Sequence, residues 1–136
     1  MIVVDTNVVA YYLLGGPEAG AATATLFRDP DWVAPPLWRS EFRSVVAKHM
    51  RFRELSLEGA AAIFDRAERL FGHREHPVDS AHVLALAMES GCSTYDCEFV
   101  SLAMQRQAKV VTADGRLVRA FPGVAIHLND FVQEQR

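Results

Sequence analysis

Short apolar runs alternate along the chain with longer stretches in which apolar residues recur at helical spacing. The short runs predict β-strands at residues 2–4, 32–34, 76–78, 109–112 and 124–127. The longer stretches, with their proline, glycine and capping signals, predict helices at residues 6–14, 17–28, 37–52, 56–72, 79–91, 95–107 and 115–121 and a last turn near 129–130. Short apolar strands separated by helices are typical of a mostly parallel sheet covered on both faces. The pattern therefore predicts an α/β fold.

Length and composition restrict the class of protein. The chain has 136 residues, half of them apolar and 23% charged, which fits a single domain over residues 1–136. No segment approaches the ~20 apolar residues of a membrane helix. The first residues lack the basic segment and the long apolar core of a signal peptide. We therefore expect a cytoplasmic protein in which Cys92 and Cys97 are reduced thiols.

Four acids stand where predicted strands end or predicted helices begin. Asp5 comes directly after the first strand, and Asp114 follows the fourth strand after one intervening residue. Glu41 lies in about the first turn of the third helix, and Asp96 opens the sixth helix. In open α/β sheets, ligands bind at the carboxyl ends of the strands. We therefore expect these acids to converge on one crevice.

Clustered carboxylates point to a metal ion, although each acid also has a simpler interpretation. Neighbouring like charges raise the pKa of a carboxyl group, and a bound cation removes that cost. Oxygen ligands suit Mg²⁺ or Mn²⁺ rather than Zn²⁺, and such ions can activate water and stabilise a phosphoryl displacement. The cluster therefore favours phosphodiester hydrolysis. Taken singly, Asp5, Asp96 and Asp114 would each also suit a helix N-cap, and Glu41 would suit a solvated helix face.

Four blocks of sequence carry a resemblance to a known family. They are residues 1–7, residues 34–36 with Ser40 and Glu41, residues 93–103, and residues 109–114. In this order and at these separations they resemble PIN domains, above all the VapC-type toxin ribonucleases of bacterial toxin–antitoxin pairs. The resemblance implies a PIN-like three-layer sandwich, with a five-stranded parallel sheet of order 3-2-1-4-5 flanked by helices.

The same resemblance implies an activity, a site and partners. The protein would be a Mg²⁺- or Mn²⁺-dependent endoribonuclease with one or two ions, and its catalytic and metal-binding acids would be Asp5, Glu41, Asp96 and Asp114. Side chains that orient carboxylates or water would be Thr6, Asn7 and Thr112. As a toxin it would bind RNA as its substrate, form a homodimer and be inhibited by a cognate antitoxin protein. The apolar helices at 6–14 and 17–28 offer surface for such partners.

Three further features concern the metal ions and the RNA. Ser44 stands where many relatives carry Asn, and Arg116 stands where some carry a further acid, so the number of metal ions stays open. A net charge of −3 does not mark a nucleic-acid binder, but basic residues cluster between positions 39 and 53. Of these, Arg39 and Arg43 flank Glu41 and are the better candidates for contact with RNA phosphates. The alternative is a solvated helix face.

Other functions fit parts of the pattern. A haloacid-dehalogenase-like phosphatase also has an acid after its first strand, but it needs a second Asp two residues later, where this chain has Asn7. A receiver domain needs a phosphoacceptor Asp, which Asp79 could imitate, and a Lys at the end of its fifth strand, which is absent here. A PIN scaffold that binds RNA or protein without cutting would not need all four acids.

Overall fold

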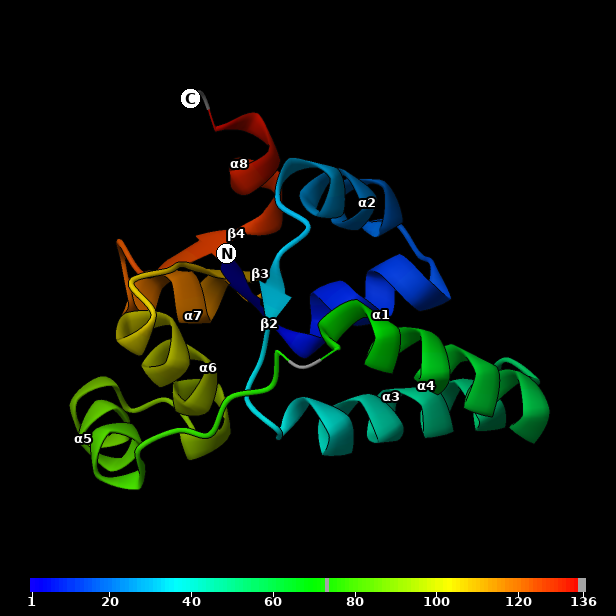
Figure 1. The fold of residues 1–136 in the computed structure, drawn as a ribbon, viewed down its shortest axis with the longest axis horizontal. Helices are drawn as coiled ribbons and strands as arrows, with labels where there is room; N and C mark the ends of the chain where they lie inside the picture. Colours follow the sequence, from blue (N-terminus) through cyan, green and yellow to red (C-terminus); the bar gives the residue numbers. More distant parts are fainter. Residues whose placement is uncertain (73, 135–136) are drawn as a thin grey trace.

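A small parallel sheet surrounded by helices forms the described part of the chain, residues 1–72 and 74–134, in the computed structural model (Figure 1). The expected domain over 1–136 thus includes three residues that lie outside this part. The strands are β1 (Ile2–Val4), β2 (Trp32–Val33), β3 (Val110–Thr112) and β4 (Ala125–His127). The helices are α1 (Thr6–Leu14), α2 (Ala19–Arg28), α3 (Trp38–Phe52), α4 (Leu57–Phe71), α5 (Ser80–Ser90), α6 (Thr94–Gln105), α7 (Gly115–Ala120) and α8 (Leu128–Gln133).

The sheet has a point at which the strand order reverses. Its described strands pair in parallel in the order β2-β1-β3-β4. Val3 of β1 pairs with Val33 on one side and with Val110 on the other. The chain therefore leaves β1 toward β2 and later returns to the opposite side of β1. The carboxyl ends of β1 and β3 lie at this reversal, where open α/β sheets bind ligands.

The expectation of a fifth strand at 76–78 is wrong. Among the described residues, only an isolated parallel bridge between Ala34 and Glu75 lies at the free edge of β2. The backbone N–H of His76 donates to the carbonyl of Ala34 at 3.1 Å, and pairing stops there. Prolines follow both residues, and proline has no N–H with which to continue a ladder. The observed order is the expected one without its first strand.

Helices cover both faces of the sheet. On one side α1 packs against β3, and α2 contacts both α1 and α8. On the other side α6 packs against β1 and β3, and α7 packs against β3 and β4, as right-handed crossovers require. Helices α3 and α4 lie side by side and reach beyond the sheet, in contact with α1 (Figure 1). Within the described residues, no helix has both the length and the apolar character needed to span a membrane.

The strands contribute fully buried side chains to the core. Val3, Val4, Val110 and Val111 are 0% exposed, as expected for short strands between two layers of helices. Thr112, at the end of β3, is also 0% exposed although it is polar. A buried hydroxyl needs hydrogen-bond partners, and those of Thr112 belong to the site described below.

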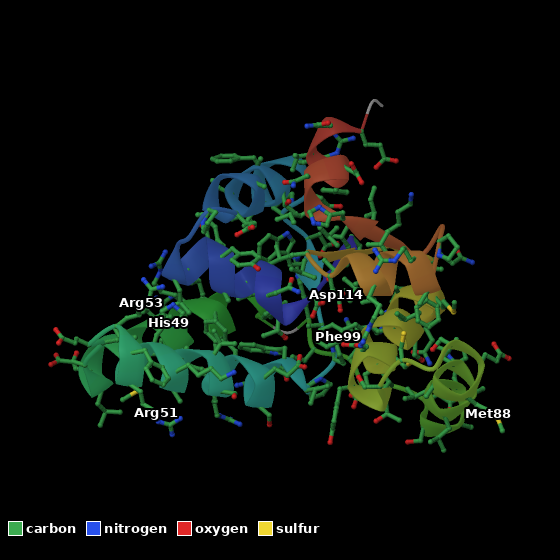
Figure 2. All side chains as sticks on the ribbon, turned by 180° about the vertical axis from the view of Figure 1, so that it is seen from behind. His49, Arg51, Arg53, Met88, Phe99 and Asp114 are labelled. Carbon is green, nitrogen blue, oxygen red and sulfur yellow. The ribbon has the colours of Figure 1, made fainter. Side chains whose placement is uncertain are left out.

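Phe99 on α6 and Met88 on α5 form a matched pair for testing which helix lies inside (Figure 2). Phe99 is 1% exposed, whereas Met88 is 90% exposed. Phe99→Ala removes a buried ring and leaves a cavity, so we expect the free energy of unfolding to fall by about 3–5 kcal/mol. Met88→Ala should change it by less than about 0.5 kcal/mol. Urea denaturation measures both, and similar losses in the two variants would contradict this assignment of the inner helix.

Candidate metal and active site

One cavity at the reversal point collects all four acids that the sequence singled out. It has a volume of about 340 Å³ and is lined by Asp5, Thr6, Asn7, Glu41, Ser44, Val45, Asp96 and Asp114. These residues come from the β1–α1 junction, α3, α6 and the β3–α7 junction. Asp114 marks this region near the middle of the molecule in Figure 2. The fold therefore brings together side chains that are up to 109 positions apart in the sequence.

Asp5 and Asp114 cap the helices that follow neighbouring strands. A carboxylate oxygen of Asp5 accepts the backbone N–H of Thr6 at 2.8 Å, at the start of α1. A carboxylate oxygen of Asp114 accepts the backbone N–H of Arg116 at 2.9 Å, at the start of α7. Each cap uses Oδ1 of its aspartate and leaves Oδ2 outside the cap.

The Asp5 carboxylate is fixed from two sides. The Thr112 hydroxyl donates to Asp5 Oδ2 at 2.7 Å and accepts the backbone N–H of Asp114 at 3.0 Å. The Asn7 amide nitrogen donates to the same Oδ2 at 3.3 Å, and its carbonyl oxygen accepts the N–H of Ala113 at 3.3 Å. These contacts join the ends of β1 and β3 and set the direction in which the Asp5 carboxylate points.

Glu41 is oriented by a residue next to Asp5 in sequence. It lies in the first turn of α3, and its Oε1 accepts the hydroxyl of Thr6 at 2.7 Å. Thr6 is 5% exposed and Glu41 is half-buried, so this hydrogen bond is partly shielded from water and is worth more than one at the surface. The Thr6 side chain therefore positions Glu41, whereas its backbone N–H donates to Asp5.

Asp96 lies in the first turn of α6 but is not its cap. The helix begins at Thr94, one residue earlier than expected, and Ser93 is the N-cap. The Ser93 hydroxyl oxygen accepts the backbone N–H of Asp96 at 3.1 Å. Sequence reasoning missed Ser93, although a serine three residues before an acid is a signal for a helix start. Because Ser93 serves as the cap, the Asp96 carboxylate is left to line the cavity.

Burial and mutual repulsion raise the pKa of Asp5, Glu41 and Asp96. Burial is the main cause that raises the pKa of Asp5 to about 6, the charges of Glu41 and Asp96 add to it, and the Thr112 hydrogen bond opposes it. Burial also raises the pKa of Glu41, with Asp96 and Glu98 contributing. The pKa of Asp96 is raised by burial and by Asp114. A bound cation would oppose both causes in every case.

The donor set fits a hard divalent cation. The titratable side chains that line the cavity are carboxylates, and its hydroxyl and amide groups add further oxygens, which suit Mg²⁺ or Mn²⁺. Over residues 1–72 and 74–134, no three side chains of His, Cys, Asp or Glu lie close enough together to hold a metal ion as they stand. The acids share a cavity without converging on one point, so binding an ion requires their side chains to move toward one another.

Arg39 and Arg43 do not line the cavity. The Arg39 guanidinium forms ion pairs with Glu68 at 2.7 Å and Glu75 at 2.6 Å, which tie α3 to α4 and to the segment that follows it. The Arg43 guanidinium lies over the ring of Phe64, 5.4 Å from its centroid. These contacts give both arginines a role in packing α3 on α4. Contact with RNA phosphates stays a prediction that their positions do not support.

Three further residues, Glu98, Arg116 and Ser44, lie near the four acids. Glu98, which sequence reasoning missed, contributes to the raised pKa of Glu41, and burial raises its own pKa. Arg116 lowers the pKa of Asp96, so the cation that stands in place of a further acid partly offsets the repulsion. Ser44, three residues after Glu41, lines the cavity from the same face of α3.

Comparison with known proteins identifies the family. The family model described as PIN domain matches residues 2–121, and the chain belongs to this family. PAE2754 from Pyrobaculum aerophilum has a similar structure, with a TM-score of 0.73 and 18% identity over 97% of this chain and 93% of that one. FitAcB from Neisseria gonorrhoeae has a TM-score of 0.70 and 22% identity over 94% of this chain and 98% of that one. At such identities the likeness concerns the fold alone. No curated protein matches the sequence significantly.

The raised pKa of Asp5 predicts a dependence of stability on pH in the metal-free protein. Since this pKa rises from 3.8 to about 6 on folding, ionisation of Asp5 weakens the fold as the pH rises through this range. Asp5→Asn removes that cost, so in EDTA the variant should exceed the wild type in stability by about 1–3 kcal/mol at pH 8 and by much less at pH 4.

Urea denaturation at the two pH values measures the effect, with Asp65→Asn as the control. Asp65 is exposed on α4 and does not line the cavity. Its variant should follow the wild type at both pH values. An advantage of Asp5→Asn that is equally large at pH 4 and pH 8 would contradict the assigned cause.

Proposed function

We propose that this PIN domain is a Mg²⁺- or Mn²⁺-dependent endoribonuclease that hydrolyses RNA phosphodiester bonds. The observation that carries the proposal is the cavity at the ends of β1 and β3, lined by carboxylates from four separate parts of the fold. We also propose that the chain acts as one PIN domain over 1–136. In support, β4 and α8, which lie beyond the matched residues, complete the sheet and pack on α2.

The protein's part in the reaction is to hold its carboxylates in place. One or two ions would be held by Asp5, Glu41, Asp96 and Asp114. A bound Mg²⁺ supplies a water of lowered pKa and positive charge for the phosphoryl oxygens. Thr112 and Asn7 hold Asp5, and Thr6 holds Glu41, so these hydrogen bonds restrict the directions in which the two carboxylates can face an ion.

The alternatives differ from this proposal in particular residues. A phosphatase of the haloacid-dehalogenase type needs a second acid at position 7, where Asn7 instead bridges Asp5 and Ala113. A scaffold without activity would have no use for four carboxylates whose burial raises the pKa of several of them, because each such group costs stability. The ribonuclease accounts for both features.

Within the family, we propose the role of a VapC-type toxin in the cytoplasm, as a homodimer inhibited by an antitoxin. The blocks of sequence at 1–7, 34–41, 93–103 and 109–114 support this role, and so does the likeness in fold to FitAcB. Partner chains also have surface to bind. On α5, Leu84 is 62% and Met88 90% exposed, and such apolar side chains are typical of protein interfaces when they lie together.

Cleavage assays test the activity. Wild-type protein with Mg²⁺ or Mn²⁺ should cut structured RNAs, and EDTA should abolish cutting. Asp5→Asn and Asp96→Asn should each lower the initial rate at least about 100-fold, while the Asp65→Asn control should not change it. Equal rates in all these proteins would refute the active site. A wild type that cuts no RNA with either ion would favour the scaffold.

Growth experiments test the role as a toxin. Induced expression of the wild type should arrest a bacterial host, and expression of Asp96→Asn should not, because the arrest depends on cleavage. Co-expression of a short reading frame adjacent to the gene, if it encodes the antitoxin, should restore growth. An equal effect of wild type and Asp96→Asn on growth would refute toxicity through this site while leaving the cleavage assay as the measure of activity.

A further inference from the structure

A second cavity opens on the same two helices that carry part of the first. It has a volume of about 260 Å³ and is lined by Leu14, Gly15, Gly16, His49 and Arg53. The first three residues lie at the end of α1, and the other two at the end of α3. The catalytic cavity uses the beginnings of the same helices, through Asn7 of α1 and Glu41 of α3. The two cavities therefore lie at opposite ends of one helix pair.

Helical spacing aligns these residues along one seam between α1 and α3. On α3, positions 41, 45, 49 and 53 recur every four residues. On α1, positions 7, 11 and 14 are separated by four and then three residues, so each set follows one face of its helix. The two helices pack against each other. From Glu41 to Arg53 the seam is about 18 Å long, at 1.5 Å per residue.

Tyr11 lies along this seam between the two cavities. Its ring is half-buried, and burial raises its pKa. The charges of both Asp5 and Glu18 contribute to that raised pKa, so Tyr11 lies within electrostatic reach of the catalytic acid at one end and of the α1–α2 connection at the other. An aromatic ring at this place offers a surface on which a nucleobase can stack.

The charge changes sign from one end of the seam to the other. The catalytic cavity is lined by acids, but after Glu41 the helix α3 carries only basic charged residues, and Arg53 follows it directly. Neither Lys48 nor Arg53 forms an ion pair with any residue in the described part of the chain. Figure 2 shows His49 and Arg53 at the end of α3 that lies away from Asp114.

The backbone of the second cavity is open to a ligand. Gly15 and Gly16 have φ angles of 90° and 111°, and nothing lies within 4 Å of the place where a Cβ would be. A ligand can therefore approach the backbone of Gly15 and Gly16 closely. Phe52, next to Arg53, is 78% exposed and adds an aromatic surface at this end of α3. Cations at the C-terminus of α3 could serve only to stabilise the helix dipole. That role would not require an adjacent cavity with accessible backbone.

We propose that the seam between α1 and α3 binds the single-stranded RNA that flanks the bond to be cut, with phosphates at Lys48 and Arg53 and bases against Tyr11 and Phe52. This inference rests on the proposed ribonuclease. A polyanion is repelled by an acidic cavity. The cations of Lys48 and Arg53, about 10 and 18 Å along α3 from Glu41, provide the attraction that holds it there. At ~3.4 Å per stacked nucleotide, the seam accommodates about five nucleotides.

Arg53→Ala and Arg51→Ala provide a matched test, because each removes one cation from the same end of α3. The two positions are separated by about 200° around the helix, and Figure 2 shows Arg51 on the side of α3 away from α1. In an Asp96→Asn background, which prevents cleavage, Arg53→Ala should weaken binding of a fluorescent RNA of about 12 nucleotides three- to tenfold at low salt. The slope of log K against log salt should fall in magnitude by about 0.7. Arg51→Ala should leave both unchanged.

Kinetics and competition complete the test. With Asp96 intact, Arg53→Ala should raise KM for the longer RNA with kcat unchanged, and should leave cleavage of an RNA of about three nucleotides unaffected. Equal effects of Arg53→Ala and Arg51→Ala would overturn the proposal. So would a poly-glutamate peptide that displaces the RNA as readily as unlabelled RNA, since the seam would then be a site for an acidic protein.

The binding measurements allow the RNA-binding seam and the ribonuclease activity to fail independently. If the wild type cuts no RNA but Arg53→Ala still weakens binding selectively, the ribonuclease fails and the RNA-binding seam stands. If the wild type cuts RNA and the two arginine variants behave alike, the seam fails and the ribonuclease stands.

Discussion

The Thr112 hydroxyl connects the two acids that follow adjacent strands. It donates to Asp5, 107 positions away in sequence, at 2.7 Å, and it accepts the backbone N–H of Asp114 at 3.0 Å. Because Thr112 is fully buried, both contacts form away from water, and losing either would leave a buried polar group without a partner. The parallel pairing of β1 with β3 is what brings these groups within reach. The site is therefore a consequence of the strand order rather than of any local motif.

The aspartates of the cavity lie at helix N-termini, which affects both the helices and the charges of the carboxylates. Asp5 and Asp114 cap α1 and α7, and Asp96 lies in the first turn of α6. The positive end of a helix stabilises a nearby carboxylate, so three helix starts oppose part of the repulsion among the acids. They do not remove it, because burial and like charge still raise the pKa of Asp5 to about 6. Capping gives Asp5 and Asp114 a structural role, and the proposed cation would account for the gathering of all four acids in one cavity.

The sequence allowed the site to be predicted more fully than its surroundings. Asp5 and Asp114 could be placed because they follow buried apolar strands, which are strong local signals. The strand at 76–78 was expected from an apolar pattern, but prolines stop the ladder after a single bridge. Arg39 was expected at the RNA because it flanks Glu41, yet its partners Glu68 and Glu75 come from segments whose approach no local pattern encodes. Whether a charged side chain forms ion pairs or stays available to a ligand thus depends on tertiary contacts.

The charge pattern of α3 serves the stability of the helix and the proposed RNA contact together. Glu41 in its first turn and Arg51 in its last complement the helix dipole, so this polarity favours folding. The same polarity places Glu41 at the candidate catalytic cavity and cations at the far end of the seam. A chain with a net charge of −3 can thus attract RNA at one end of a helix and still keep carboxylates free for a metal ion at the other. Since one arrangement would meet both demands, the proposed RNA contact would not lower the stability of α3.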